Sequence, residues 1–347
     1  TTSIECMKNN ILLLISIIFL LTVSCQEEQF EITKKDAQNL TVESPLINLI
    51  SRVAQNVTSK DNVIDGTSCF KVELPVSIIV NGIPITVNIE DDYQKVQNLI
   101  HPLPNLDVID FVYPISIVYR DFHKEKVLNT SQLEDIIDDC DDDNDGFEEI
   151  ECVKIKFPIT INSYNANNQF ANVISIYNDV DLYAFMQKIK DSDLISIKYP
   201  ISIINDKGQT IEILNNISLE ENIENCVINS GVINAKEYVS YLTKGKWRIT
   251  YFFDDINKTL NFQDYEFIFL ADGTLTVYDK AAVLYKGTWS IFKDNDELKL
   301  ELDFDDSKLE AFEYEWKIIE FVSTSFRLKE HNDSTGKLQY LYFKKKE

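Results

Sequence analysis

Carboxylates recur at alternate positions in the run DDDNDG of residues 141–146. Hard divalent cations such as Ca²⁺ prefer carboxylate oxygens, and a glycine permits the sharp turn that wraps such a loop around the ion. The pattern predicts a calcium site, with Glu151 as an alternative last ligand. The predicted ligands are Asp141, Asp143, Asp145 and Glu149. Cys152 stands where an EF-hand has a glutamate, so a plain acidic linker over residues 141–151 is the other interpretation.

Four cysteines bound two stretches of similar length in the middle of the chain. They are Cys69, Cys140, Cys152 and Cys226. In a secreted protein an even set of this kind predicts disulfides, and four cysteines allow three pairings. We favour Cys69–Cys140 and Cys152–Cys226, because each bridge then closes one of two equivalent repeat modules. Free thiols are the alternative.

Residue patterns typical of common enzymes are absent from the sequence. The three histidines show no metal-ligand spacing, and no G-x-S-x-G, Walker or H-E-x-x-H motif occurs. With 57 acidic residues, neighbouring carboxylates do not by themselves indicate a glycosidase pair. The net charge of −24 repels phosphate backbones, so we expect no nucleic-acid binding. These observations predict a protein that is not an enzyme.

One strand-like run, with alternating apolar and polar residues, occurs four times in the two cysteine-bounded stretches. Each copy carries a proline on its polar side: Pro75, Pro114, Pro158 and Pro200. A period of two predicts a strand with one buried face. Proline lacks the N–H that a central strand donates, so it belongs at an edge or a bulge. We therefore expect the same bend in each copy of one unit.

A second strand-like piece and a helix follow each run. The predicted capping boxes at the helix starts pair Asp91 with Gln94, Ser131 with Glu134, Asn178 with Asp181, and Ser218 with Glu221. The apolar face of the strands must be buried, and such helices can pack on it. Each unit is therefore predicted to consist of a strand, a second strand and a helix, arranged in two layers. Two units form each module, over residues 61–140 and 152–230.

The N-terminal segment resembles a lipoprotein export signal. Lys8 precedes an almost unbroken apolar run over residues 11–23, a length typical of a secretion signal and short for a membrane-spanning helix. The signal, with the residues upstream of it, takes up residues 1–25. It ends in Leu-Thr-Val-Ser-Cys, which resembles a bacterial lipobox and implies a lipid on Cys25; a plain signal peptide is the alternative. The acidic residues that follow resemble the export tag of Bacteroidetes-type surface lipoproteins, which implies anchoring in the outer membrane, facing the cell exterior.

Residues 26–60 combine a polar tether with a short amphipathic helix. Ser44 is a candidate N-cap and Pro45 a candidate first helical residue. Leucine, isoleucine and valine at residues 46, 49, 50 and 53 make one apolar face. We expect this helix to pack on the first module.

In residues 235–347 a short helix-like run over residues 235–242 is followed by eight short strand-like pieces without intervening helices, which predicts a small antiparallel barrel or sandwich. The motif Gly245-Lys246-Trp247, the run FLADGTLTVYD, the run KGTWSI and the ending LQYLYFKKK together resemble the lipocalin-like domains of secreted bacterial lipoproteins. The resemblance implies that Trp247 closes the base of the barrel under a cation of the last strand, Lys344, or under Arg327. Trp289 and Trp316 are then the candidates for lining an open mouth.

The predicted fold is therefore α+β, with tandem two-layer modules followed by a small antiparallel β-barrel. The predicted function is that of a surface-tethered, non-catalytic binding lipoprotein that holds a small hydrophobic ligand in the barrel. The alternative is a structural or adhesive protein whose repeats contact protein partners. A pocket lined by tryptophan and tyrosine would favour the first, and a filled barrel with exposed apolar repeat edges would favour the second.

Overall fold

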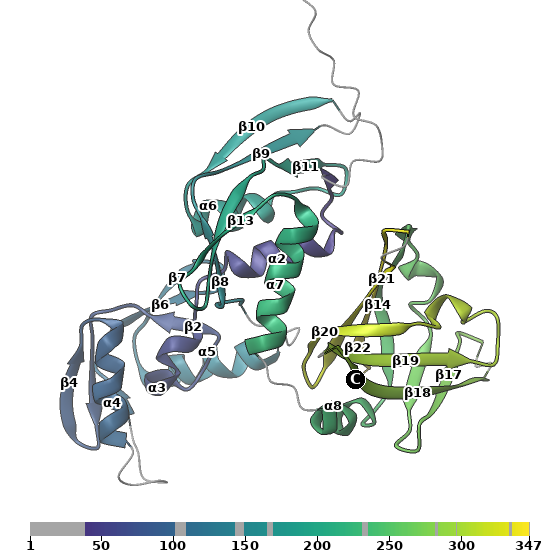
Figure 1. Cartoon of the computed structure of the whole chain (residues 1–347). Helices are drawn as coiled ribbons and strands as arrows, with labels where there is room; N and C mark the ends of the chain where they lie inside the picture. The colour runs from purple at the N-terminus through teal and green to yellow at the C-terminus, as the bar shows by residue number, and fades with distance from the viewer. Residues whose placement is uncertain are drawn as a thin grey trace, which may run out of the picture. The chain divides into compact units, whose positions relative to one another are not determined.

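The computed structural model describes residues 39–100, 109–142, 149–164, 169–230, 235–281, 284–295, 297–332 and 335–346, except for the side chains of residues 140–142. Leu40–Glu347 form one compact unit. The fold is mixed α+β, and its C-terminal region is a closed antiparallel barrel, as the sequence predicts (Figure 1).

The first module holds two repeats whose strands are divided between two small sheets. Its elements are α3 (Asn62–Asp65), β2 (Phe70–Val72), β3 (Val76–Val80), β4 (Ile83–Val87), α4 (Tyr93–Ile100), β5 (Ile109–Phe111), β6 (Ile115–Tyr119), β7 (Lys124–Val127) and α5 (Thr130–Asp142), with 3-10 turns at Ser59–Asp61 and Glu90–Asp92. The sheets have the orders β4-β3-β5 and β2-β6-β7. Each sheet therefore combines the hairpin of one repeat with the leading strand of the other.

The proline of each repeat stands where the chain leaves one sheet and enters the other. Pro75 lies between β2 and β3, and Pro114 lies between β5 and β6; both follow cis peptide bonds. β2 pairs with β6, whereas β3 pairs with β5. The expected bend is present in each copy, and it divides the predicted single run into two strands.

The second module repeats this arrangement. Its elements are β8 (Val153–Lys156), β9 (Ile159–Tyr164), β10 (Phe170–Ile176), α6 (Asp179–Met186), β11 (Leu194–Ile197), β12 (Ile201–Asn205), β13 (Thr210–Ile213) and α7 (Asn216–Ser230). The sheets have the orders β13-β12-β8 and β1-β11-β9-β10, where β1 (Asn39–Leu40) comes from the N-terminal side. Pro158 and Pro200 again follow cis peptide bonds between strands of different sheets.

Helix α2 (Pro45–Val53) begins after Ser44 with proline at its first turn, as predicted. Its buried side chains, among them Leu46 and Ile50, belong to the same core as Leu182 of α6 and Leu219 of α7. The expectation that this helix packs on the first module is therefore wrong, because it packs in the core of the second. An apolar stripe predicts that a helix is buried, but it does not distinguish between two similar modules.

One of the four predicted helix caps has the expected partners, and the other three are displaced along the chain. Asn178 accepts a hydrogen bond from the backbone N–H of Asp181 at 2.8 Å, as predicted. The caps of α5 and α7 are Asn129 and Asn215, which precede the predicted serines. In the first repeat Asp92, rather than its neighbour, accepts backbone N–H groups. Asn129 and Asn215 lie closer to the preceding strands than the predicted serines do, and their side-chain oxygens satisfy free N–H groups of the first helical turn.

Eight strands and one helix build the C-terminal barrel. They are α8 (Ala235–Leu242), β14 (Trp247–Asp254), β16 (Glu266–Phe269), β17 (Thr274–Tyr278), β18 (Leu284–Asp294), β19 (Glu297–Phe304), β20 (Glu315–Phe321), β21 (Ser325–Asn332) and β22 (Lys337–Lys345). A short strand β15 (Ile256–Asn257) and 3-10 turns at Thr259–Asn261 and Glu310–Phe312 complete it. β14 pairs with both β16 and β22, which closes the sheet.

Across the described residues, no helix has the length and apolar character needed to cross a membrane.

Candidate functional site

Trp247 lies at the end of the barrel that α8 adjoins. Its Nε1 donates to the carbonyl of Leu242 in α8 at 2.8 Å, and its ring packs edge-on against Phe326 at 4.9 Å. The side chain is fully buried. Trp247 therefore joins the helix to the barrel core.

The lysine of the last strand that lies nearest to Gly245 and Trp247 is Lys345, rather than the predicted Lys344. Lys345 lies opposite Trp247 in the β14–β22 register. Gly245 has φ +107°, and a Cβ built on it would lie 2.7 Å from Cε of Lys345. A glycine is needed here because any side chain would be strained at this φ and would press on that lysine. Arg327, the other predicted cation, instead lies 5.1 Å from the ring of Tyr342.

Trp289 and Trp316 belong to the barrel core and do not line an open mouth, so that expectation is wrong. Trp316 is fully buried and Trp289 is 8% exposed. Their indole N–H groups donate to backbone carbonyls of Leu270 and Phe312 at 3.0 Å and 2.8 Å. Buried tryptophan needs such a partner for its polar end, and here neighbouring backbone supplies it. Phenylalanine rings fill the space between them: Phe252, Phe267, Phe269, Phe312, Phe326 and Phe343.

A cavity on the outer wall of the barrel is too small to hold an organic ligand. Its volume is about 10 Å³, which is room for one water molecule. It is lined by Leu49, Glu224, Val227, Ile319, Glu320, Arg327 and Tyr342. The cavity therefore offers no site for a hydrophobic small molecule.

Of the four predicted calcium ligands, the structure describes the side chain of Glu149. Glu149 accepts hydrogen bonds from the N–H and hydroxyl of Thr58 at 2.7 Å and 2.8 Å, and its other oxygen lies 2.9 Å from Nε of Arg120. Thr58 and Arg120 thus engage the Glu149 carboxylate, and calcium binding by Glu149 stays a prediction. Asp143, Asp145 and the side chain of Asp141 lie outside the described residues. Within the described part of the chain, no three histidine, cysteine, aspartate or glutamate side chains gather to hold a metal.

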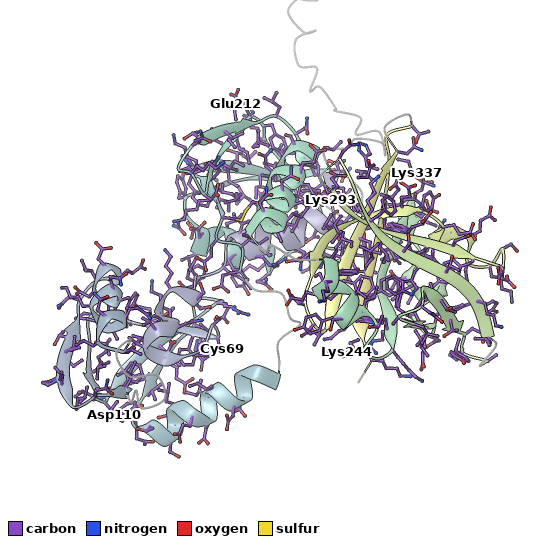
Figure 2. The ribbon with its side chains drawn as sticks, turned by 60° about the horizontal axis from the view of Figure 1, so that its bottom comes forward. Cys69, Asp110, Glu212, Lys244, Lys293 and Lys337 are labelled. Carbon is purple, nitrogen blue, oxygen red and sulfur yellow. A yellow bond between two sulfur atoms is a disulfide. The ribbon has the colours of Figure 1, made fainter. Side chains whose placement is uncertain are left out.

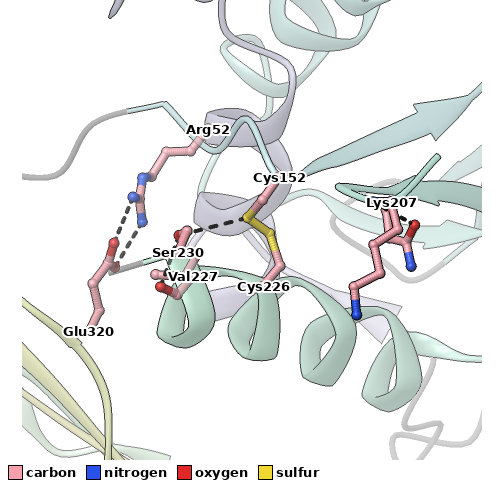
Figure 3. The surroundings of a disulfide bond; sticks show 8 residues. Arg52, Cys152, Lys207, Cys226, Val227, Ser230 and Glu320 are labelled. Carbon is pink, nitrogen blue, oxygen red and sulfur yellow. Dashed lines mark hydrogen bonds and ion pairs between the residues drawn. A yellow bond between two sulfur atoms is a disulfide. The ribbon is translucent and has the colours of Figure 1, made fainter. Parts of the chain in front are cut away.

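The predicted bridge of the second module is present. Cys152 and Cys226 form a disulfide with a Cα–Cα distance of 5.8 Å, which joins the start of β8 to α7 (Figure 3). Cys69 is also disulfide-bonded. The side chain of Cys140 is outside the described residues, so its pairing with Cys69 stays a prediction. Cys25, the predicted lipidation site, is likewise outside them.

The four repeat sheets can be compared position by position, because each has a hairpin strand, a central strand and an exchanged strand. One cross-strand row on the face away from the core contains the residue four positions after each proline. In chain order the rows are Pro84–Ile79–Asp110, Lys124–Val118–Lys71, Val173–Asn162–Ser196 and Thr210–Ile204–Lys154. Three rows contain a charged residue, and the row through Val173 contains none. Figure 2 labels Asp110 and Glu212, charged residues exposed on two of the other sheets.

The sheet of β9, β10 and β11 has no charged residue in any of its strands, and the same holds for β1 beside it. In a chain with 26% charged residues this is a marked local difference. We call its outward side the neutral face. It consists of Thr160, Asn162, Tyr164, Phe170, Val173, Ser175, Leu194 and Ser196. Lys198, directly after β11, stands at its border.

Large side chains on the neutral face are exposed to solvent. Phe170 is 58% and Val173 is 59% exposed. A bulge in β10 between Phe170 and Asn172 brings Phe170 onto the same side as Val173, where its ring lies 6.1 Å from Tyr164. The Tyr164 hydroxyl lies 3.3 Å from the hydroxyl of Ser196. Exposed aromatic residues among serine and asparagine are typical of protein-binding surfaces. The uncharged strands were visible in the sequence, but their common face depends on the strand exchange.

A buried cluster of charges lies where α7 meets β21 and β22. Lys329 Nζ lies 2.8 Å from Glu220 and 3.0 Å from Glu224, and the Tyr340 hydroxyl donates to Glu220 at 2.6 Å. The pKa of Glu224 is raised to about 8, mainly by burial; the charge of Lys329 opposes this rise, and the charge of Glu220 adds to it. The predicted sites include none of these four residues.

A second charged contact joins α2 to the same wall of the barrel. Arg52 makes a two-pronged ion pair with Glu320, at 2.7 Å and 2.8 Å (Figure 3). Glu320 is also 3.4 Å from Arg327, which donates to Asn48 of α2 at 2.8 Å. Both contacts tie the second module to the barrel and leave their polar groups buried, so they serve structure rather than ligand binding.

Two buried carboxyl groups adjoin each other in the first module. Burial raises the pKa of Asp61 to about 6, and burial together with the charge of Asp61 raises the pKa of Asp65 to about 9. Asp61 accepts from the N–H of Val72 at 2.6 Å, and Asp65 accepts from that of Thr67 at 3.2 Å. The pair thus fastens the segment before β2 to that strand.

No protein-family model matches the chain, and no curated protein is detectably similar to it.

Proposed function

We propose that this chain is a surface-tethered, non-catalytic protein that binds other proteins through the neutral face of its second repeat module. This is the alternative function predicted from the sequence, that of a structural or adhesive protein whose repeats contact protein partners. The observation that carries it is the absence of charge from one of four otherwise equivalent sheets. Two exposed apolar side chains, Phe170 and Val173, stand on that sheet.

The composition of the neutral face supports a protein partner. Its centre is formed by aromatic, aliphatic and hydroxyl side chains, and Lys198 stands at its border. Protein interfaces commonly have a centre depleted of charge and a polar rim. In a chain of net charge −24, an uncharged area is also where an acidic or neutral partner meets the least repulsion.

The filled barrel argues against small-molecule binding as the main activity. An eight-stranded barrel either holds one small ligand or is filled by its own side chains. Here the interior is occupied by tryptophan and phenylalanine, and the indole groups are satisfied by backbone carbonyls. In this proposal the barrel is a rigid support attached to α2 and α7.

The surface location rests on the sequence at residues 7–25. A lipid on Cys25 would hold the modules at the outer membrane, with residues 26–38 as the tether. Replacing Cys25 with serine should release the protein from the membrane fraction and remove its acyl mass. A wild-type protein that is recovered without a lipid would remove the anchor from the proposal.

Adhesion of cells that display the chain tests the proposed function. Val173→Lys adds one charge to the neutral face, and we expect it to reduce attachment to other cells or to protein-coated surfaces. Thr210→Lys is the matched control, since Thr210 occupies the equivalent position in the fourth repeat. Equal attachment by both variants and the wild type, at equal surface amounts, would contradict the proposal.

A further inference from the structure

We propose that the free edge of β10 pairs with β10 of a second copy of this chain; this inference rests on the proposed function and names the partner. Among the strands that the structure describes, β10 is the last in the order β1-β11-β9-β10, so one of its edges has no neighbouring strand there. On the opposite side the sheet is extended by β1. An edge strand presents a row of backbone donors and acceptors that can continue a sheet into another chain.

The corresponding edge strands of the other three repeats carry features that oppose such pairing. β4 contains Pro84, which has no N–H to donate. β7 has the sequence KEKV, and lysines on an edge strand discourage pairing with another strand. β13 contains Glu212, which is exposed. Each of these three edges is therefore protected by a recognised device.

β10 has none of these features and is longer than the other three edge strands. It has seven residues, FANVISI, against five in β4 and four each in β7 and β13. Neither proline nor a charged residue occurs in it. Its bulge between Phe170 and Asn172 interrupts the regular edge, so pairing is confined to residues 172–176.

A second copy meets the requirements that this edge sets. The partner must offer an uncharged strand with an open edge, and β10 of another copy is such a strand. Antiparallel pairing of two identical strands is a two-fold arrangement in which each copy contributes the same residues. Two chains of net charge −24 repel each other, and contact through β10 keeps charged side chains out of the new strand pair. The two four-stranded sheets would then form one continuous sheet.

Sedimentation equilibrium of the mature chain, residues 26–347, tests the pairing. We expect a reversible dimer, and we expect Val173→Lys to weaken it at least about tenfold, because each copy would then bring a lysine into an otherwise uncharged strand pair. Thr210→Lys should leave self-association unchanged. Val173 is 59% exposed in the single chain, so the lysine should not disturb folding, which circular dichroism and thermal unfolding can verify.

Hydrogen exchange gives an independent measurement. The amides of residues 172–176 should exchange more slowly as the protein concentration rises, whereas those of β13 should not. A wild-type chain that remains monomeric at millimolar concentration would overturn the pairing, as would a dimer insensitive to Val173→Lys. If the purified chain is monomeric but adhesion still depends on Val173, the second copy is excluded and the proposed binding of another protein stands.

Discussion

Lys329 of β21 and Glu220 of α7 form an ion pair of 2.8 Å in which both side chains are less than a tenth exposed. Glu224, one helical turn further along α7, lies 3.0 Å from the same ammonium group. One cation thus contacts two carboxyl groups where the second module meets the barrel. A buried charge is tolerated when partners surround it, and removing one partner leaves the others uncompensated.

Replacing Lys329 with methionine should therefore destabilise the barrel. We expect a loss of about 3–5 kcal/mol, since the Glu220 carboxylate would stay buried without its cation. The three tryptophans of the chain, Trp247, Trp289 and Trp316, all lie in the barrel, so tryptophan fluorescence during urea unfolding reports on that region. A variant as stable as the wild type would show that this cluster does not support the barrel.

Lys317→Met is the matched control for that experiment. Lys317 pairs with Glu297 at 2.7 Å, but the two side chains are 23% and 43% exposed. Exposed pairs contribute about 0–1 kcal/mol, so the control should change stability little.

Glu224 should make this contact weaker as the pH rises. Its folded-state pKa is raised to about 8 from an ordinary value of 4.5, mainly by burial. A raised pKa means that the folded state binds the proton more tightly, so the contribution is complete below about pH 4.5 and is lost as the pH rises through about 8. Glu220 on its own helix and Lys329 on the barrel act on the charge of Glu224, and Glu320 and Arg327 of the barrel line the same cavity.

Glu224→Gln should remove this pH dependence, because glutamine keeps the shape of the protonated acid. The measurement is the difference in unfolding free energy between the variant and the wild type from pH 5 to pH 9. The difference is needed because Asp61 and Asp65 have raised pKa values too and act in the same direction in the first module. A constant difference across this range would contradict the role given to Glu224.

Local patterns in the sequence predicted the repeats, the bends at proline, the bridge between Cys152 and Cys226, and the closed barrel. Each depends on residues close in sequence or on the regular spacing of a repeated unit. The strand exchange was not predicted. The alternation of apolar and polar residues before and after Pro75 would be the same if the run formed one strand of a single sheet or two strands of different sheets. The module on which α2 packs was misassigned for a similar reason, since both modules offer an apolar face.

The candidate site was less accessible to sequence reasoning. The absence of charge from β9, β10 and β11 can be read from the chain, but those strands belong to different repeats and share a sheet only through the exchange. The cluster of Glu220 with Lys329 joins residues 109 positions apart, and in a chain with 57 acidic residues no local signal distinguishes it. Trp289 and Trp316 were predicted to line the mouth of the barrel, but they lie in its core. The sequence shows that a tryptophan faces inward, but whether it lines an opening or fills the core depends on the side chains across the barrel.

Removing the bridge of the second module should lower its stability without unfolding the barrel. Cys152 and Cys226 are 74 positions apart, and a bridge over a loop of this size stabilises by about 2–4 kcal/mol, mainly by restricting the unfolded chain. The double variant Cys152→Ser, Cys226→Ser should show this loss in urea unfolding followed by far-ultraviolet circular dichroism. The tryptophan transition should move less than the circular dichroism transition.

Peptide mapping without reduction completes that experiment. We expect the peptide containing Cys140 to be linked to the one containing Cys69. A link between Cys140 and any other cysteine would contradict the prediction that both modules are closed in the same way.

The filled barrel predicts how its tryptophans respond to substitution and to ligands. Trp247 is fully buried and joins α8 to the core, so Trp247→Ala should destabilise the barrel by about 3–5 kcal/mol, as large-to-small core changes do. Trp316→Ala should have a similar cost, because Trp316 is equally buried and its indole donates to Phe312. A residue at an open mouth would instead be replaced at little cost. Titration of the wild type with fatty acids and small aromatic probes should leave the tryptophan fluorescence unchanged. Saturable quenching would show that the barrel binds a ligand, and small-molecule binding would then be the favoured function.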